Sequence, residues 1–195
     1  MFIISQTDLA GAFYSTTLDQ ILAFIPTVLS QFESGIKVLV MTLKCHETLN
    51  IEAFVSVLIS EVGITLKFHS LLIFSRDYVD HGARNVWIRN TGPLGWLTQN
   101  VATFGNNPSK LDKQGCVSVH NQVAKTLNLQ LHDLSKKLQG QYSDAIVTYI
   151  DIFSIKYVLI AKYSKYGFQQ PIMACCGYRG PPLNYNSRVL PCFKF

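Results

Sequence analysis

Apolar residues recur along the chain at two spacings, which predict alternating strands and helices. Three short, apolar and β-branched runs at residues 2–4, 86–88 and 146–150 are typical of strands. Between the first two, Thr17 and Gln20 fit a capping box that would begin a helix. The apolar stripe of that helix comprises Leu18, Ile21, Leu22, Ile25, Val28, Leu29 and Phe32, with Pro26 as an expected kink.

Two further helices are predicted in the second half of the chain. Ser109 is the expected N-cap of a long helix that ends near Gly140. Its apolar stripe comprises Val119, Val123, Leu127, Leu131, Leu134 and Leu138. A last helix from Ile155 to Tyr166 is closed by Gly167.

This order of elements predicts the fold class and the place of a site. Strand, helix, strand, helix, strand, helix is the order of an α/β protein whose parallel sheet carries helices on its faces. Ligands in such sheets lie at the carboxyl ends of the strands. The loops after Ile4, Arg89 and Ile152 are therefore expected to hold the site.

One stretch breaks the pattern. Residues 38–76 are rich in Val, Leu, Ile and Phe, but they keep neither a two-residue nor a 3.6-residue period. They stand between a helix and a strand that a short loop would normally join. We therefore interpret residues 38–76 as an insertion.

Composition and charge narrow the function classes. With 195 residues, 48% of them apolar and 15% charged, the chain is expected to form one globular domain. Its net charge of +5 is spread along the sequence, which argues against a nucleic-acid partner. No apolar run is long enough for a transmembrane segment, and the first residues lack the pattern of a signal peptide, so the chain as written is expected to be cytoplasmic.

Searches for catalytic and metal-binding motifs are negative. The sequence has no Gly-x-Ser-x-Gly and no Gly-Asp-Ser, and no aspartate is followed by a histidine three residues later. His46-Glu47 begins like a zinc protease motif, but Asn50 stands where the second histidine is needed. The five cysteines lack paired Cys-x-x-Cys spacing. We therefore expect neither a metal nor a cofactor.

Four segments together carry a family resemblance. Residues 5–11 read Ser-Gln-Thr-Asp-Leu-Ala-Gly, and the other three segments are residues 82–95, 110–116 and 166–185. In combination they resemble the plant GDSL esterase/lipase family, also called SGNH hydrolases, whose third block reads Gly-Gln-Asn-Asp-Leu-Ala-Gly. The resemblance covers most of the chain. It implies a three-layer α/β/α, flavodoxin-like SGNH hydrolase fold with a parallel sheet, here in incomplete form.

The resemblance also implies a reaction. GDSL enzymes hydrolyse carboxylic esters of lipids or small molecules through an acyl-serine, are secreted, and need no cofactor. Their nucleophile lies in a Gly-Asp-Ser block and their acid and base in an Asp-x-x-His block, and we expect this chain to lie between the two. It would then hold no catalytic residue and be inactive. The alternative is a catalytically dead fragment that acts only as a binding or interaction protein.

Thr7 and Ser5 are the site residues that the resemblance offers. Thr7 stands where the family has its oxyanion-hole asparagine, and Ser5 replaces the glycine of the same block. Both are therefore expected to be remnants of the oxyanion hole. The family cysteine after Gly95 is Trp96 here, which leaves Cys116, its disulfide partner in the family, without that partner.

The resemblance also explains the aperiodic stretch. Family members pass almost directly from a segment like residues 34–37 to one like residues 80–84. We therefore interpret residues 38–76 as a retained intron and residues 190–195 as an aberrant C-terminus of an otherwise partial GDSL/SGNH domain that spans residues 1–195. No oligomeric state is predicted.

Overall fold

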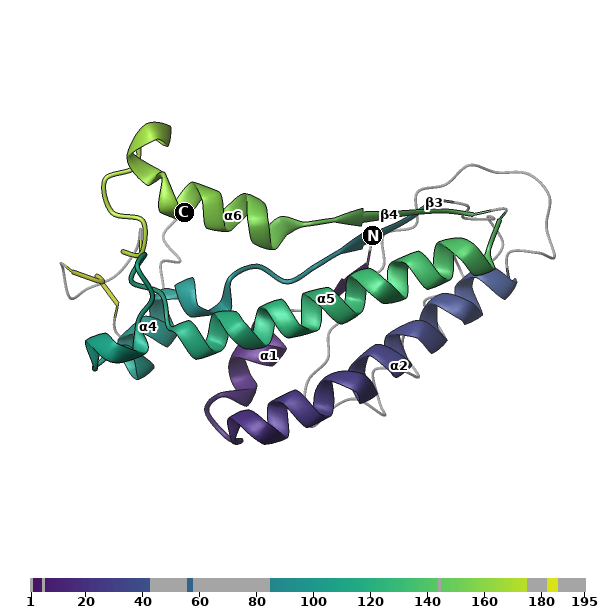
Figure 1. Cartoon of the computed structure of the whole chain (residues 1–195), viewed down its shortest axis with the longest axis horizontal. Coiled ribbons are helices and arrows are strands. Elements are labelled where there is room, and N and C mark those ends of the chain that lie inside the picture. Colours follow the sequence, from purple (N-terminus) through teal and green to yellow (C-terminus); the bar gives the residue numbers. More distant parts are fainter. Residues whose placement is uncertain are drawn as a thin grey trace, which may run out of the picture. The chain divides into compact units, whose positions relative to one another are not determined.

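The computed structural model describes residues 2–4, 6–42, 56–57, 85–143, 145–174 and 182–185 (Figure 1). The strands of this part are β1 (Phe2–Ile4), β2 (Ser56–Val57), β3 (Asn85–Arg89) and β4 (Ile146–Ile150). The α-helices are α1 (Gln6–Ala12), α2 (Leu18–Thr42), α4 (Thr98–Phe104), α5 (Ser118–Gln141) and α6 (Ile152–Ala161). Short 3-10 helices are η2 (Leu94–Trp96), η3 (Pro108–Lys110) and η4 (Tyr163–Tyr166).

The chain divides into two compact units. The sheet unit comprises residues 1–91 and 126–152, and the second unit comprises residues 92–125 and 153–195. Helix α5 contributes its first turns to the second unit and the remainder to the sheet unit. Each unit is described below by itself.

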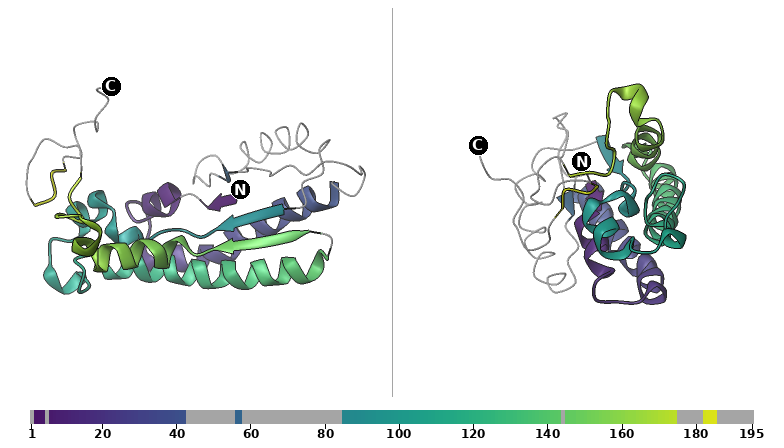
Figure 2. Two further views of the ribbon diagram at one scale, coloured as in Figure 1. Left: turned by 90° about the horizontal axis from the view of Figure 1, so that it is seen from above. Right: turned by 90° about the vertical axis from the view of Figure 1, so that its left-hand side faces the viewer.

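All described strands of the sheet unit run parallel, in the order β2-β1-β3-β4. Strand β3 is central, because β1 pairs with one of its edges and β4 with the other. Helices α2 and α5 lie on the same side of these strands (Figures 1 and 2). The prediction of a mixed α/β fold with a parallel sheet is confirmed, and so are the three predicted strands.

Helix α2 begins as the sequence predicts. The Thr17 N–H donates to Gln20 Oε1 at 2.9 Å, and the Gln20 N–H donates to Thr17 Oγ1 at 3.4 Å, which is the reciprocal pair of a capping box. Pro26 lies inside the helix. The buried side of the helix consists of Ile21, Ile25, Val28, Leu29, Phe32 and Ile36.

Two described pieces of backbone fall within the predicted insertion. Helix α2 continues to Thr42, and strand β2 pairs with β1 through Ser56 and Val57. The other residues of that stretch lie outside the described part of the chain, as do residues 190–195. Whether either stretch derives from an intron stays a prediction.

The long helix α5 begins at Ser118, so the expected start at Ser109 is wrong. Asn107 is the residue that caps a turn here: its Oδ1 accepts hydrogen bonds from the N–H and the hydroxyl of Ser109, and Pro108 follows at the first helical position. This helical turn, η3, ends at Lys110. The predicted stripe is buried from Val123 to Leu138, whereas Val119 is exposed.

The last predicted helix is shifted and divided. Helix α6 begins at Ile152, three residues before the predicted start. Only Asp151 separates it from the end of strand β4. Its predicted last turn is the separate 3-10 helix η4. Gly167 closes η4 with a φ of +81°, so the predicted glycine stop is confirmed.

Asp112 holds together the loop that precedes α5 in the second unit. Its Oδ1 accepts from the N–H groups of Gln114 and Cys116, both at 2.9 Å, and its Oδ2 accepts from Tyr157 Oη at 3.1 Å. Burial and the Asp112 charge raise the pKa of Tyr157 to about 12. Burial likewise raises the pKa of the free Cys116 to about 12, so this thiol stays protonated and unreactive.

Gly95 is required by close packing in the same loop. A Cβ atom at this position would collide with the carbonyl of Val117, whose N–H donates to the Gly95 carbonyl at 2.9 Å. The Gly95 N–H donates in turn to Asn121 Oδ1 at 2.8 Å. Trp96 donates its indole N–H to the carbonyl of Pro171.

The burial of His120 predicts that the second unit becomes less stable in acid. The imidazole is buried against the ring of Phe104, and burial lowers the pKa of His120 to about 4. The unfolded chain, with a histidine pKa of 6.5, therefore takes up a proton that the folded chain does not. This contribution is complete above pH 6.5 and is lost as the pH falls toward 4, up to about 3 kcal/mol.

The measurement is the free energy of unfolding at pH 7 and at pH 4.5. Replacing His120 by Gln removes the titrating group, so the decrease between the two pH values should be smaller in His120→Gln than in the unmodified chain. His132→Gln is the matched control, since His132 is only half-buried. An equal decrease in all three proteins would contradict the assignment.

Candidate functional site

The carboxyl ends of three strands meet at one edge of the sheet unit. Ile3 pairs with Arg89, and Arg89 pairs with Ile150, so the chain leaves all three strands at the same level. The predicted loops after β1 and β3 are therefore brought together. The third predicted loop is wrong in detail, because strand β4 ends at Ile150 and α6 has begun by Ile152.

Thr7 lies in the first turn of α1, directly after β1. The backbone thus places it at the edge where the strands end. Ser5 lies outside the described residues. The expected roles of Thr7 and Ser5 in an oxyanion hole stay predictions.

A buried asparagine joins the ends of β3 and β4. Asn90, which directly follows β3, donates from Nδ2 to Tyr149 Oη at 2.9 Å and to Asp151 Oδ1 at 2.8 Å. Its N–H also donates to the carbonyl of Ile150 at 3.1 Å. Asn90 itself is 3% exposed, whereas its partner Asp151 is exposed, so only the asparagine end of these bonds is buried. The side chain fixes the direction in which both strands leave the sheet.

A second asparagine, on helix α5, binds the backbone of Thr91, the residue that follows Asn90. Asn128 of α5 accepts from the Thr91 N–H at 3.1 Å and donates to the Thr91 carbonyl at 2.8 Å. Its own carbonyl accepts from Tyr149 Oη at 3.2 Å, and the His132 ring packs 4.8 Å from the Tyr149 ring. Burial and the nearby Asp151 charge raise the pKa of Tyr149, which keeps this phenol a neutral donor. A connected hydrogen-bond network thus joins the ends of β3 and β4 to α5.

The described part of the chain contains two histidines, His120 and His132. Ser135 Oγ donates to the backbone carbonyl of His132, not to its ring. His120, the other described histidine, packs against Phe104 in the second unit. Within the described ranges there is also no cluster of three or more His, Cys, Asp or Glu side chains that would hold a metal ion. The edge can orient backbone and donate hydrogen bonds.

Sequence reasoning missed Asn90 and Asn128, although a signal for the second was present. Three polar residues of α5 stand at seven-residue intervals beside its apolar stripe, and all three are buried: Asn121, Asn128 and Ser135. Polar residues at helical spacing on a buried face must find hydrogen-bond partners. For Asn90, the only signal in the sequence was its position immediately after a strand.

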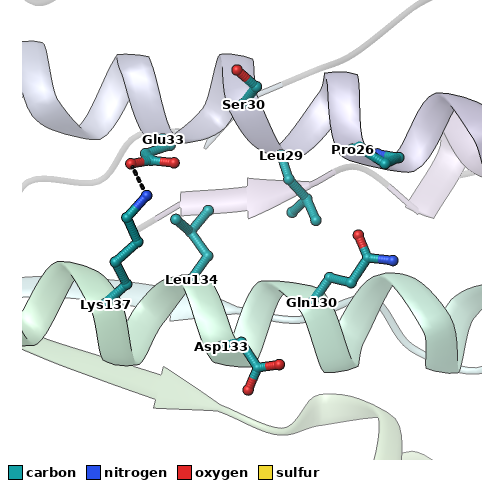
Figure 3. Close-up of a pocket in the computed structure, with 8 residues that line it drawn as sticks. All are labelled: Pro26, Leu29, Ser30, Glu33, Gln130, Asp133, Leu134 and Lys137. Carbon is teal, nitrogen blue, oxygen red and sulfur yellow. Dashed lines mark hydrogen bonds and ion pairs between the residues drawn. The ribbon is translucent and has the colours of Figure 1, made fainter.

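A groove between α2 and α5 is a concave feature of the sheet unit (Figure 3). It has a volume of about 370 Å³ and is lined by Pro26, Leu29, Ser30, Glu33, Gln130, Asp133, Leu134 and Lys137. Glu33 accepts from Lys137 at 2.8 Å and from Lys37 at 2.6 Å, and these two ammonium groups lower the pKa of Glu33. The lining contains no histidine.

Among the described residues, no helix has both the length and the apolar character needed to cross a lipid bilayer.

The hydrogen bonds of Asn90 predict that its replacement by the isosteric Asp lowers the stability of the protein substantially. Asn90→Asp replaces a donating amide by a carboxylate that faces Asp151, so two donor bonds are lost and two negative charges oppose each other. We expect a loss of about 2–3 kcal/mol in the free energy of unfolding at pH 7. The loss should shrink at pH 3, where carboxylates are protonated. Asn106→Asp, at an exposed position, is the control and should change stability by less than about 0.5 kcal/mol. Equal effects of the two changes would contradict the network.

Comparison with known proteins assigns the chain to a family. The family model described as GDSL-like Lipase/Acylhydrolase matches residues 8–187. The protein "GDSL esterase/lipase At1g54790" of Arabidopsis thaliana is 44% identical over 215 aligned residues, which cover 97% of this chain and 43% of that protein. "GDSL esterase/lipase At3g05180" of the same plant is 48% identical over 189 residues, which cover 97% of this chain and 40% of the relative.

The chain thus spans about two fifths of the length of these two relatives. A third Arabidopsis protein, "GDSL esterase/lipase At3g62280", is 48% identical over 109 residues, or 56% of this chain. The resemblance seen in the four sequence segments is confirmed by these matches and by the family model. On this evidence the chain belongs to the GDSL esterase/lipase family.

Proposed function

We propose that these 195 residues are the central part of an SGNH-type carboxylic ester hydrolase with a three-layer α/β/α, flavodoxin-like fold. The observation that carries the proposal is the family match over residues 8–187, combined with the meeting of strand ends at one edge of a parallel sheet. In α/β proteins this edge is where substrates bind. The substrate would be an ester of a lipid, of an acetylated sugar or of another acetylated small molecule.

The reaction would proceed through an acyl-serine, without metal or cofactor. The serine attacks the ester carbonyl, the alcohol leaves, and water then releases the acid. The negative oxygen that forms in each step needs preorganised donors. Thr7 is proposed as one of them, with Ser5 beside it. The network of Asn90 and Asn128 supports this role because it fixes the strand ends next to α1.

The 195 residues on their own are proposed to be inactive. Their sequence contains no Gly-Asp-Ser and no Asp-x-x-His, so the nucleophile, acid and base of the family are not among them. A second function follows from the same observation. Without turnover, the chain would act as a binding or interaction protein, in which the rigid strand edge serves only as structure.

A pair of assays tests both parts of the proposal. The 195-residue chain should hydrolyse 4-nitrophenyl acetate no faster than its Thr7→Ala variant, and it should not be labelled by a fluorophosphonate, which reacts with activated serines. Turnover clearly above that of Thr7→Ala would show a catalytic centre that the proposal lacks.

The family role is tested in a chimera. Residues 1–195 would replace the matched region of "GDSL esterase/lipase At3g05180", whose own sequence supplies the flanking parts. In this chimera, Thr7→Asn should raise kcat, by up to about 10³, because it restores a longer oxyanion donor. Thr7→Ser keeps a hydroxyl and is the matched control, expected to change kcat little. A Thr7→Asn rate no higher than that of Thr7→Ser would contradict the assigned role.

A further inference from the structure

An exposed carboxylate stands at the edge of the sheet unit where the strands end. Asp151 directly follows β4 and directly precedes α6. It is exposed, whereas Asn90, which donates to Asp151 Oδ1 at 2.8 Å, is buried. The carboxylate of Asp151 is therefore anchored at one oxygen by a buried amide and still meets the solvent at the edge where ligands of parallel sheets bind.

The amide that anchors Asp151 is itself held in place. Asn90 also donates to Tyr149 Oη at 2.9 Å, and this phenol donates in turn to the carbonyl of Asn128 at 3.2 Å. The Asn90 N–H donates to the Ile150 carbonyl at 3.1 Å. A side chain that is already fixed loses less conformational entropy when a ligand binds to it, so these bonds preorganise Asp151 as a ligand-binding group.

Capping of α6 does not exhaust the carboxylate of Asp151. The residue stands at the N-cap position of this helix, where aspartate is one of the preferred residues. An ionised carboxylate has about four acceptor positions on its two oxygens. The bond from Asn90 and a capping bond together use only part of this capacity. The remainder can accept hydrogen bonds from a bound ligand.

The sheet places Asp151 at a suitable distance from Thr7. Thr7 lies in the first turn after β1, and Asp151 follows β4. Strands β1 and β4 flank β3, and neighbouring strands lie about 4.8 Å apart, so the ends of β1 and β4 are about 10 Å apart. With the ester carbonyl held at Thr7, an acetyl group is too short to span this distance. An alcohol part of the size of a monosaccharide does span it.

We propose that Asp151 selects esters whose alcohol part carries free hydroxyl groups, as in a partly acetylated sugar. An ionised carboxylate only accepts hydrogen bonds, so hydroxyl donors satisfy it with short, charge-assisted bonds. The alkyl chain of a lipid ester offers no donor, and covering the carboxylate with it would cost desolvation free energy. The inference rests on the proposed function and narrows its substrates to acetylated polyols.

The experiment uses the chimera in which residues 1–195 replace the matched region of "GDSL esterase/lipase At3g05180". Its kcat and KM are measured on 6-O-acetylglucose and on 4-nitrophenyl acetate, which carries no hydroxyl group. Asp151→Asn keeps an acceptor for Asn90 and an equally good N-cap, but it removes the charge. It should raise KM for 6-O-acetylglucose about tenfold, because a charge-assisted bond becomes a neutral one, and leave kcat within about twofold. Both constants for 4-nitrophenyl acetate should stay unchanged.

Asp133→Asn is the matched control. It removes an exposed carboxylate of α5 that lines the groove beside α2 and not the strand edge, so KM for both esters should stay the same. Equal KM values for 6-O-acetylglucose in Asp133→Asn and Asp151→Asn would overturn the proposal. So would an Asp151→Asn effect that is larger on acetylcholine than on 6-O-acetylglucose, because the carboxylate would then recognise positive charge and not hydroxyl groups.

Binding of glucose to the same chimera, measured by NMR titration, gives a readout that does not depend on ester turnover. Its Kd should rise about tenfold in Asp151→Asn. Glucose binding that depends on Asp151, without hydrolysis of either ester, would refute the proposed function and retain the role of Asp151. Hydrolysis of both esters that is indifferent to Asp151→Asn would refute the role of Asp151 and retain the proposed function. Absence of both binding and hydrolysis would refute both.

Discussion

The parallel pairing of β1 and β4 with the two edges of β3 is the constraint on which the rest of the structure depends. It brings residues 3, 89 and 150, which are far apart in the sequence, to one level of the sheet. The position of α1, of the turn after β3 and of the start of α6 follows from it. Because each strand is short, hydrogen bonds within the sheet alone would leave these strand ends poorly fixed.

Side-chain amides extend the pairing beyond the strands. At Thr91 the backbone has left the sheet but is still buried, so its N–H and carbonyl need partners. Asn128 supplies both, in the same way that a neighbouring strand would. Leaving either group without a partner would cost about 1–3 kcal/mol, more than one satisfied hydrogen bond adds. Two asparagines therefore determine the geometry of the edge at which the family is expected to act.

Local patterns in the sequence predicted the elements that local forces determine. The capping box of Thr17 and Gln20, the strand at 146–150 and the glycine stop at Gly167 depend on neighbouring residues only. The predicted start of α5 at Ser109 is wrong, because Asn107, followed by Pro108, caps only a single turn there and α5 begins at Ser118.

The candidate site was harder to predict, because its contacts join distant residues. Asn90 and Asp151 are 61 positions apart, and Asn128 meets Thr91 across 37. Spacing along the sequence does not reveal such pairs, although the rule that ligands lie at the carboxyl ends of parallel strands singled out this edge as the expected place of a site. Thr7 was identified from the family resemblance alone, and the backbone places it at that edge.

Native-state hydrogen exchange, read residue by residue by NMR, tests the central constraint most directly. The amide hydrogens of Asn90 and Thr91, bonded to the Ile150 carbonyl and to Asn128, should exchange as slowly as that of Ile88 in the middle of β3. Exchange of both at the rate of the exposed Asn106 would contradict the account, because the strand ends would then not be held together.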